Sequence, residues 1–276
     1  MKNHRLVEPD SLSRAYPATI PQLLVSVRNL AEARQAVAGG ADWIDLKDPQ
    51  QGPLGPVRPA VAREVAETFF ARHPLSAAAG ELLSWQAPGI SPPLAARPAG
   101  GEWIANNGKD GGLLSVPGIR LLKLGLAGCG TTSHWQNRWV AAQEEIRAAG
   151  KRLVAVVYAD WKEAAAPPPE QIVEQATDKQ CDYLLIDTFC KTRGTMLDCL
   201  PLDELAALLG RARKASMWTV VAGSLSIASL RHLISLPIDV VAVRGAVCKG
   251  GRGGILQKDR IERFQDALRA LPWSDR

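Results

Sequence analysis

The sequence has few of the features that mark membrane or exported proteins. No apolar run approaches the roughly 20 residues that a helix needs to cross a bilayer. The first twenty residues contain acids and a proline, and no apolar stretch of signal-peptide type. We therefore predict an N-terminal extension over residues 1–20, a single catalytic domain over residues 21–276, a cytoplasmic location and no membrane partner.

Cysteine and histidine are sparse and unpatterned. The 276 residues include five cysteines with no CxxC pair, and four histidines with no HxH or HExxH spacing. An odd number of cysteines without a framework is typical of proteins from a reducing compartment. We expect no structural metal site.

The chain is basic, with a formal net charge of +5 and a pI of about 9.0. A basic chain raises the alternative of a nucleic-acid-binding or scaffold protein. Its lysines and arginines are interspersed with acids, and no RNP, zinc-finger or basic-helix signature is present. We therefore expect no nucleic-acid partner. The basic charge has another explanation, because a positive field also steers phosphorylated substrates into a cleft.

Short apolar runs alternate with helix-like patterns along the chain. Near-continuous apolar strands joined by helical crossovers predict an α/β protein with a parallel sheet covered by helices. Eight such runs favour a closed (β/α)8 TIM barrel over an open, doubly wound sheet. The runs cover residues 23–27, 43–47, 75–80, 121–126, 153–159, 183–188, 217–223 and 238–245. The clearest helical patterns cover residues 30–38, 135–149, 202–215 and 258–271.

One connection departs from this regular spacing. Residues 84–118, between the third and fourth strands, are rich in glycine and proline, so any helix there is short or broken. We predict an irregular insertion in the barrel. Its role as a lid, a mobile loop or a contact in a homo-oligomer stays open.

Lysines and aspartates stand at the carboxyl ends of three predicted strands. Asp45 and Lys47 share one face of the second strand, because side chains alternate with a period of two. Lys123 lies in the fourth strand, Asp187 ends the sixth, and Lys191 follows four residues later. Barrel active sites lie at this end of the strands, so we predict that these five residues form a catalytic cluster.

Such a cluster suits chemistry that needs a neutral lysine. Neighbouring ammonium groups disfavour each other's charge, so at least one lysine should have a lowered pKa. A neutral lysine is the nucleophile of Schiff-base chemistry, and the carboxylates can move protons or stabilise the iminium. The structural alternative is a buried Lys–Asp ion-pair network that closes the barrel.

The last two strands end in sequences that suit a phosphate. Loops at these positions of barrels often bind phosphate through backbone N–H groups, and Arg244 could add a bidentate contact. The alternative is that the glycines only form tight turns. Ser26 ends the first strand at the same mouth. The predicted substrate- and phosphate-binding residues are Ser26, Gly223, Ser224, Arg244 and Gly245. Residues 249–254 (KGGRGG) also suit an anion but are not a P-loop.

Several of these segments resemble one family. The opening LLVSVRNLAEARQAVAGGADWIDLKDPQQGPLG, followed by SAAAGEL, IRLLKLGLAG, LLIDTFCKTRGTMLD, VAGSL and VAVRGAVC, is similar to the (5-formylfuran-3-yl)methyl phosphate synthases of methanofuran biosynthesis. The resemblance covers nearly the whole chain after residue 20. The motifs IDLKDP and IDTFCK are its most specific parts, because each places a lysine at a matched spacing from an aspartate.

The resemblance implies an activity and a set of roles. Members are (β/α)8 barrels, carbon–oxygen lyases that condense two molecules of glyceraldehyde 3-phosphate into a furan aldehyde phosphate, with loss of phosphate and water. Related sequences serve methylofuran synthesis. By resemblance, Lys47 forms the Schiff base and Asp45 lies beside it. The resemblance also implies that the active site is completed by Lys123, Asp187 and Lys191, and that no metal or organic cofactor is needed. The residues alone leave open a class I aldolase or a sugar-phosphate isomerase acting on triose phosphates.

Overall fold

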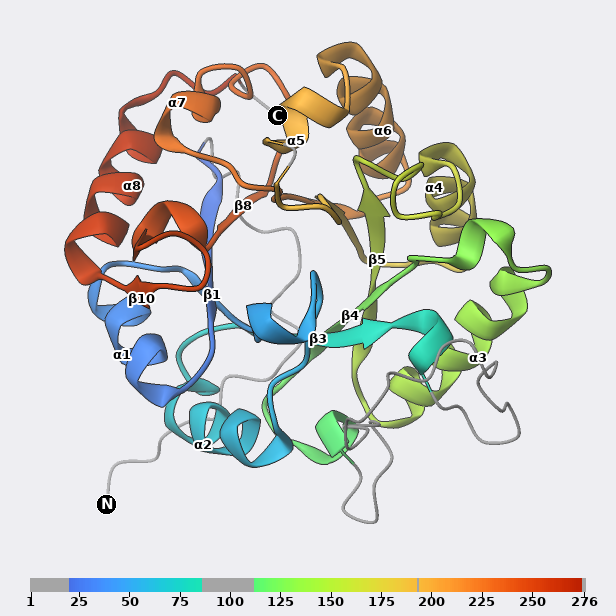
Figure 1. Ribbon diagram of the computed structural model, residues 1–276, viewed down its shortest axis with the longest axis horizontal. Helices are drawn as coiled ribbons and strands as arrows, with labels where there is room; N and C mark the ends of the chain where they lie inside the picture. Colours follow the sequence, from blue (N-terminus) through green and yellow to red (C-terminus); the bar gives the residue numbers. More distant parts are fainter. Residues whose placement is uncertain (1–19, 86–111, 193, 275–276) are drawn as a thin grey trace.

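The computed structural model describes residues 20–85, 112–192 and 194–274 (Figure 1). Eight parallel strands close into a barrel in the order β1 to β8, and β8 pairs with β1. The predicted (β/α)8 fold is therefore confirmed, and each predicted strand end lies within two residues of the observed one. The strands are β1 (Gln22–Val27), β2 (Trp43–Leu46), β3 (Leu75–Glu81), β4 (Leu121–Gly125), β5 (Arg152–Tyr158), β6 (Tyr183–Asp187), β7 (Trp218–Val221) and β8 (Val240–Val243).

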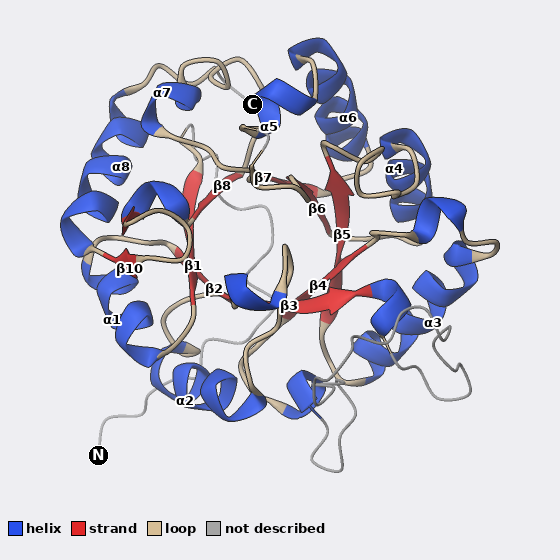
Figure 2. Ribbon diagram, viewed as in Figure 1, coloured by secondary structure: helices blue, strands red, loops and turns tan. Residues whose placement is uncertain are grey.

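Helices surround the barrel (Figure 2). The four helices predicted from sequence correspond to α1, α3, α6 and α8, with ends that agree within one residue. Asn29 caps α1, because its side chain accepts the Glu32 N–H at 2.9 Å. The helices are α1 (Leu30–Ala38), α2 (Pro59–Phe69), α3 (Trp135–Ala148), α4 (Pro169–Asp178), α5 (Met196–Cys199), α6 (Leu202–Lys214), α7 (Ile227–Leu230) and α8 (Lys258–Ala270).

The period of two along β2 separates an apolar face from a charged one. Ile44 and Leu46 are fully buried. Asp45 lies level with Ser26 of β1 and Ser76 of β3, and its carboxylate accepts hydrogen bonds from both hydroxyls, at 2.9 and 2.7 Å. Because these three side chains meet across neighbouring strands, Asp45 points into the barrel, as the sequence predicted.

Aromatic side chains fill the barrel interior near the amino ends of the strands. The rings of Trp43, Tyr183 and Trp218 lie 6.2 Å apart, centroid to centroid, in each of their three pairs. Trp43 and Tyr183 lie in one layer of the interior with aliphatic side chains of neighbouring strands, among them Leu24, Val154 and Val220. This apolar base separates the charged residues above it from the opposite end of the barrel.

The connection between β3 and β4 is described only at its ends. Residues 82–84 and 112–115 form short 3₁₀ helices, and the Lys151 ammonium holds the later part by donating to the carbonyls of Val116 and Ile119, both at 2.7 Å. The rest of the predicted insertion, residues 86–111, and nearly all of the predicted N-terminal extension lie outside the described residues. In the part of the chain that is described, no helix is long and apolar enough to cross a bilayer.

Candidate active site

A cavity of about 350 Å³ opens at the carboxyl ends of the strands. It is the place where barrel enzymes carry their active sites. All ten residues that the sequence analysis singled out line it, so residues from six strands and their following loops come together. They are Ser26, Asp45, Lys47, Lys123, Asp187, Lys191, Gly223, Ser224, Arg244 and Gly245.

Asp187 at the end of β6 joins two lysines. Its carboxylate lies 3.2 Å from the Lys47 ammonium and 2.6 Å from that of Lys191, which also donates to the Thr188 hydroxyl at 2.9 Å. Burial opposes ionisation of Asp187, but the two ammonium groups outweigh it and hold its pKa well below the ordinary range. One fixed negative charge therefore stands between two cations.

Lys191 and Lys123 have lower pKa values than a lysine in water. Burial, assisted by the positive charge of Lys47, lowers the pKa of Lys191 to about 8 despite the opposing effect of Asp187. Burial also lowers the pKa of Lys123, again with a contribution from Lys47. The prediction that at least one lysine of the cluster has a lowered pKa is thus confirmed.

Asp45 holds Lys123 deeper in the barrel. The Lys123 ammonium lies 2.5 Å from the Asp45 carboxylate, and both side chains are nearly inaccessible to solvent. The Ser26 and Ser76 hydroxyls described above complete the shell around Asp45. A buried charge pair is tolerated when further hydrogen bonds satisfy it, so Asp45 and its two serines hold Lys123 at the floor of the cavity.

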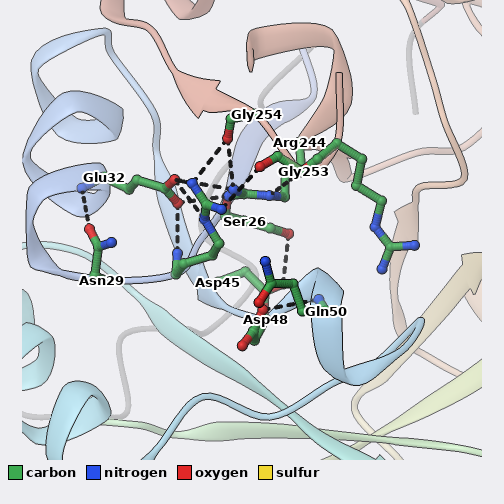
Figure 3. A network of polar contacts seen from close by, with 11 residues as sticks. Ser26, Asn29, Glu32, Asp45, Asp48, Gln50, Arg244, Gly253 and Gly254 are labelled. Carbon is green, nitrogen blue, oxygen red and sulfur yellow. Dashed lines mark hydrogen bonds and ion pairs between the residues drawn. The ribbon is translucent and has the colours of Figure 1, made fainter. Parts of the chain in front are cut away.

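Arg244 is fully engaged by protein groups (Figure 3). Its guanidinium donates to both oxygens of Glu32, at 2.8 and 3.1 Å, and to the carbonyls of Ser26 at 2.8 Å, Arg252 at 2.8 Å and Gly254 at 3.5 Å. These contacts use all five N–H donors of an arginine. The bidentate phosphate contact predicted for Arg244 would require breaking them, so its side chain is placed to hold the surrounding loops.

The turn after β7 is shaped by two residues with left-handed backbone. Gly223 has φ +90° and Ser224 has φ +55°. A Cβ added at Gly223 would lie 2.8 Å from Cβ of Met196 and 3.0 Å from the Thr188 methyl group, so this position has no room for a larger side chain. The two positive φ values turn the chain at this point, where both residues line the cavity.

A carboxyl group that no pattern in the sequence indicated lies close to Lys47 and Asp187. Glu81 at the end of β3 accepts the Tyr158 hydroxyl at 2.6 Å and the Ala127 N–H at 3.0 Å. Burial raises the pKa of Glu81, although Tyr158 and the other donors oppose this. Tyr158 lies level with Asp187 in the sheet, and no pattern in the sequence links it to Glu81.

Gly125 provides the space for this pair, which gives a first prediction. A Cβ at Gly125 would overlap the Glu81 carboxylate and the Tyr158 hydroxyl. Gly125→Ala should therefore break their hydrogen bond and lower the free energy of unfolding by about 1–3 kcal/mol. Gly210→Ala in α6, where no atom lies within 4 Å of the new Cβ, is the control and should stabilise by about 0.5–1 kcal/mol. Chemical denaturation measures both, and equal effects would contradict this packing.

Asp160 orders the loop that carries Lys191. Its two carboxylate oxygens accept the backbone N–H groups of Phe189 and Cys190, at 2.7 and 2.6 Å. Among the residues that the structure describes, no group of three or more His, Cys, Asp or Glu side chains is arranged to hold a metal ion.

Comparison with known proteins identifies the family. A family model described as 4-HFC-P synthase matches residues 23–265, which is most of the chain. The chain belongs to the 4-HFC-P synthase family. A (5-formylfuran-3-yl)methyl phosphate synthase of Methanococcus maripaludis is 33% identical over 90% of this chain and 99% of its own length. One of Methanothermobacter thermautotrophicus is 31% identical over 89% of this chain and 98% of its own length.

Solved structures support the fold alone. Phosphoribosyl anthranilate isomerase from Thermotoga maritima aligns with a TM-score of 0.59 at 14% identity, covering 91% of this chain and 100% of its own. KGPDC from Streptococcus mutans aligns with a TM-score of 0.53 at 16% identity, covering 90% and 97%. Members of the 4-HFC-P synthase family thus share a barrel with enzymes of other names, and activity has to be argued from the site.

Proposed function

We propose that this member of the 4-HFC-P synthase family condenses two molecules of glyceraldehyde 3-phosphate into (5-formylfuran-3-yl)methyl phosphate through a Schiff base on Lys47. The observation that carries the proposal is the contact of one carboxylate, Asp187, with two lysines in a cavity that is strongly cationic. The names of the relatives support the same product. The activity would make the protein a carbon–oxygen lyase of methanofuran or methylofuran synthesis.

We infer that Lys47 forms the imine. Its side chain is 10% exposed, between the 6% of Lys123 and the 17% of Lys191, and its nitrogen contacts a carboxylate that stays ionised. Asp187 would stabilise the iminium that forms when the lysine nitrogen attacks the aldehyde and water leaves. An enamine formed from that iminium would then attack the aldehyde of the second triose phosphate.

The remaining lysines suit the elimination steps. The product holds one phosphate, so the two substrates must lose one inorganic phosphate and two molecules of water. Each departing oxygen needs a proton or a positive charge, and groups with a pKa near the working pH transfer protons best. Lys191, with its pKa of about 8, and Lys123, whose pKa is also lowered, fit this role.

The proposed activity is tested by supplying the purified protein with glyceraldehyde 3-phosphate alone. We expect a new ultraviolet absorbance, because the product has a conjugated furan aldehyde, together with one inorganic phosphate released per furan formed. A class I aldolase or an isomerase would give only aliphatic products with no chromophore. Consumption of substrate without the chromophore would therefore replace the proposal by one of these activities.

Lys191 should set an alkaline limit on activity. With its pKa of about 8, the ammonium form predominates below pH 8 and the neutral form above it. If the ammonium form is required, kcat/KM for furan formation should fall above pH 8. Arginine keeps its charge beyond this range, so the activity that remains in Lys191→Arg should lose that limb. A limb that is unchanged in the variant would assign it to another group.

A further inference from the structure

The segment after β8 forms a short hairpin at the edge of the barrel. Strands β9 (Cys248–Lys249) and β10 (Ile255–Leu256) pair antiparallel, and the glycine-rich loop between them carries Arg252 (Figure 1). Gly250 and Gly251 have φ of +86° and +74°, which turns the chain back within a few residues. The hairpin lies beside α1, with which β10 makes contact.

A buried charge network fixes this loop in place. Arg28 and Arg244 both pair with the carboxylate of Glu32, at 2.6 and 2.8 Å (Figure 3). Arg28 also donates to the carbonyls of Gly253 at 3.1 Å and Gly254 at 3.0 Å. Burial opposes ionisation of Glu32, but the bonds from the two arginines lower its pKa, so the anchor stays charged at neutral pH. The glycine-rich loop is thereby held by several strong hydrogen bonds.

Arg244 also holds the backbone of Arg252 itself, through the Nε bond to its carbonyl described above. The Arg252 side chain then reaches across to the loop after β2, where its Nη2 donates to the carbonyls of Gly52 at 2.9 Å and Pro53 at 3.3 Å. Its charge contributes to the lowered pKa of Lys191, so the guanidinium lies near that ammonium. Arg252 is half-buried and lines the cavity.

Arg252 is the cationic side chain of the cavity lining for which the described residues show no carboxylate partner. The lining contains five cationic side chains and two carboxylates. Lys47, Lys123, Lys191 and Arg244 each pair with a carboxylate. Across the described part of the chain, the ion pairs include none made by Arg252, whose Nε and Nη1 also make no hydrogen bond there. A guanidinium held at one edge by two carbonyls presents its remaining donors as a ready site for an anion.

We propose that Arg252 forms a second phosphate subsite, separate from the one expected at the loops after β7 and β8. The inference rests on the proposed function, because a condensation of two triose phosphates must hold two phosphate groups at once. The turns at Gly223 and Gly245 would take the phosphate of the triose bound to Lys47. Arg252 takes the phosphate of the second triose, on the side of the cavity nearer β2.

The subsite is tested first by binding, with glycerol 3-phosphate as a probe that has no aldehyde and cannot react. Isothermal titration calorimetry on the whole chain should give two sites in the parent protein and one in Arg252→Ala. Arg263→Ala, which removes an exposed arginine of α8, is the control and should keep both sites. Two sites in Arg252→Ala, or a single site in the parent protein, would overturn the subsite.

Kinetics then separate the subsite from the overall function. In Arg252→Ala the concentration of glyceraldehyde 3-phosphate that half-saturates furan formation should rise about tenfold to a hundredfold, the loss expected for a charge-assisted contact. Trapping of one triose on Lys47 by borohydride should be unchanged, and Arg252→Lys should recover part of the loss. Equal loss of trapping and turnover would place Arg252 at the first phosphate. The calorimetry could show two sites in the parent protein and one in Arg252→Ala while the parent protein forms no furan. That result would refute the proposed function but support the subsite.

Discussion

Replacing Lys47 by arginine is expected to reduce furan formation by roughly a thousandfold or more, in line with the loss of a nucleophile in other enzymes. Arginine keeps the positive charge beside Asp187 but cannot form an imine, because it is not deprotonated in proteins. The variant therefore separates nucleophilic chemistry from charge. The rate of furan absorbance at saturating glyceraldehyde 3-phosphate measures the effect.

Lys214→Arg is the matched control for this prediction. Lys214 ends α6 on the outside of the barrel, where its side chain is exposed, so the same substitution should leave turnover unchanged. Circular dichroism should show that both variants are folded. Near-normal turnover in Lys47→Arg would remove the imine and reduce Lys47 to a structural or phosphate-binding cation.

Replacing Asp187 by asparagine should have the next largest effect. The buried carboxylate neutralises both Lys47 and Lys191, so its loss leaves two ammonium groups facing each other without a counter-charge. Breaking a buried pair from one side costs about 3–5 kcal/mol, and part of this should appear as a lower free energy of unfolding. Turnover should fall by about a hundredfold or more, because the iminium loses its stabilising charge.

Asp182→Asn provides the comparison. Asp182 pairs with Arg152 at 3.0 Å, but both side chains are about half exposed, at 47% and 49%. An exposed pair contributes about 0–1 kcal/mol, so this variant should resemble the parent protein in stability and activity. Urea denaturation and furan formation measure both variants. A loss for Asp187→Asn no larger than that for Asp182→Asn would show that the Asp187 pairs contribute little.

Local patterns in the sequence predicted the parts of the site that lie along single strands. The alternation in β2 placed Asp45 and Lys47 on the inner face, and the apolar runs located the strand ends that carry Lys123 and Asp187. These predictions succeeded because the side-chain period of a strand and the carboxyl-end rule of barrels need no knowledge of distant residues.

Predictions that depended on distant partners were incomplete. Arg244 was expected to present its guanidinium to phosphate, but Glu32, 212 residues away in the chain, occupies it. Glu81 and Tyr158 are 77 residues apart in the chain, and the sequence around either residue does not indicate the other as its partner. Arg252 was noted only as part of an anion-friendly segment. Side-chain pairing across the barrel depends on the closed sheet and on which charges are buried together, and the spacing along the chain carries no information on either.

Reductive trapping tests the central claim most directly. The protein is incubated with glyceraldehyde 3-phosphate and borohydride, digested, and the modified lysine is mapped by mass spectrometry. We predict a single reduced triose phosphate adduct on Lys47, absent from Lys47→Arg, while a parallel sample without reductant develops the furan absorbance. An adduct on Lys123 or Lys191 in place of Lys47, or furan formation with no trapped lysine at all, would contradict the account.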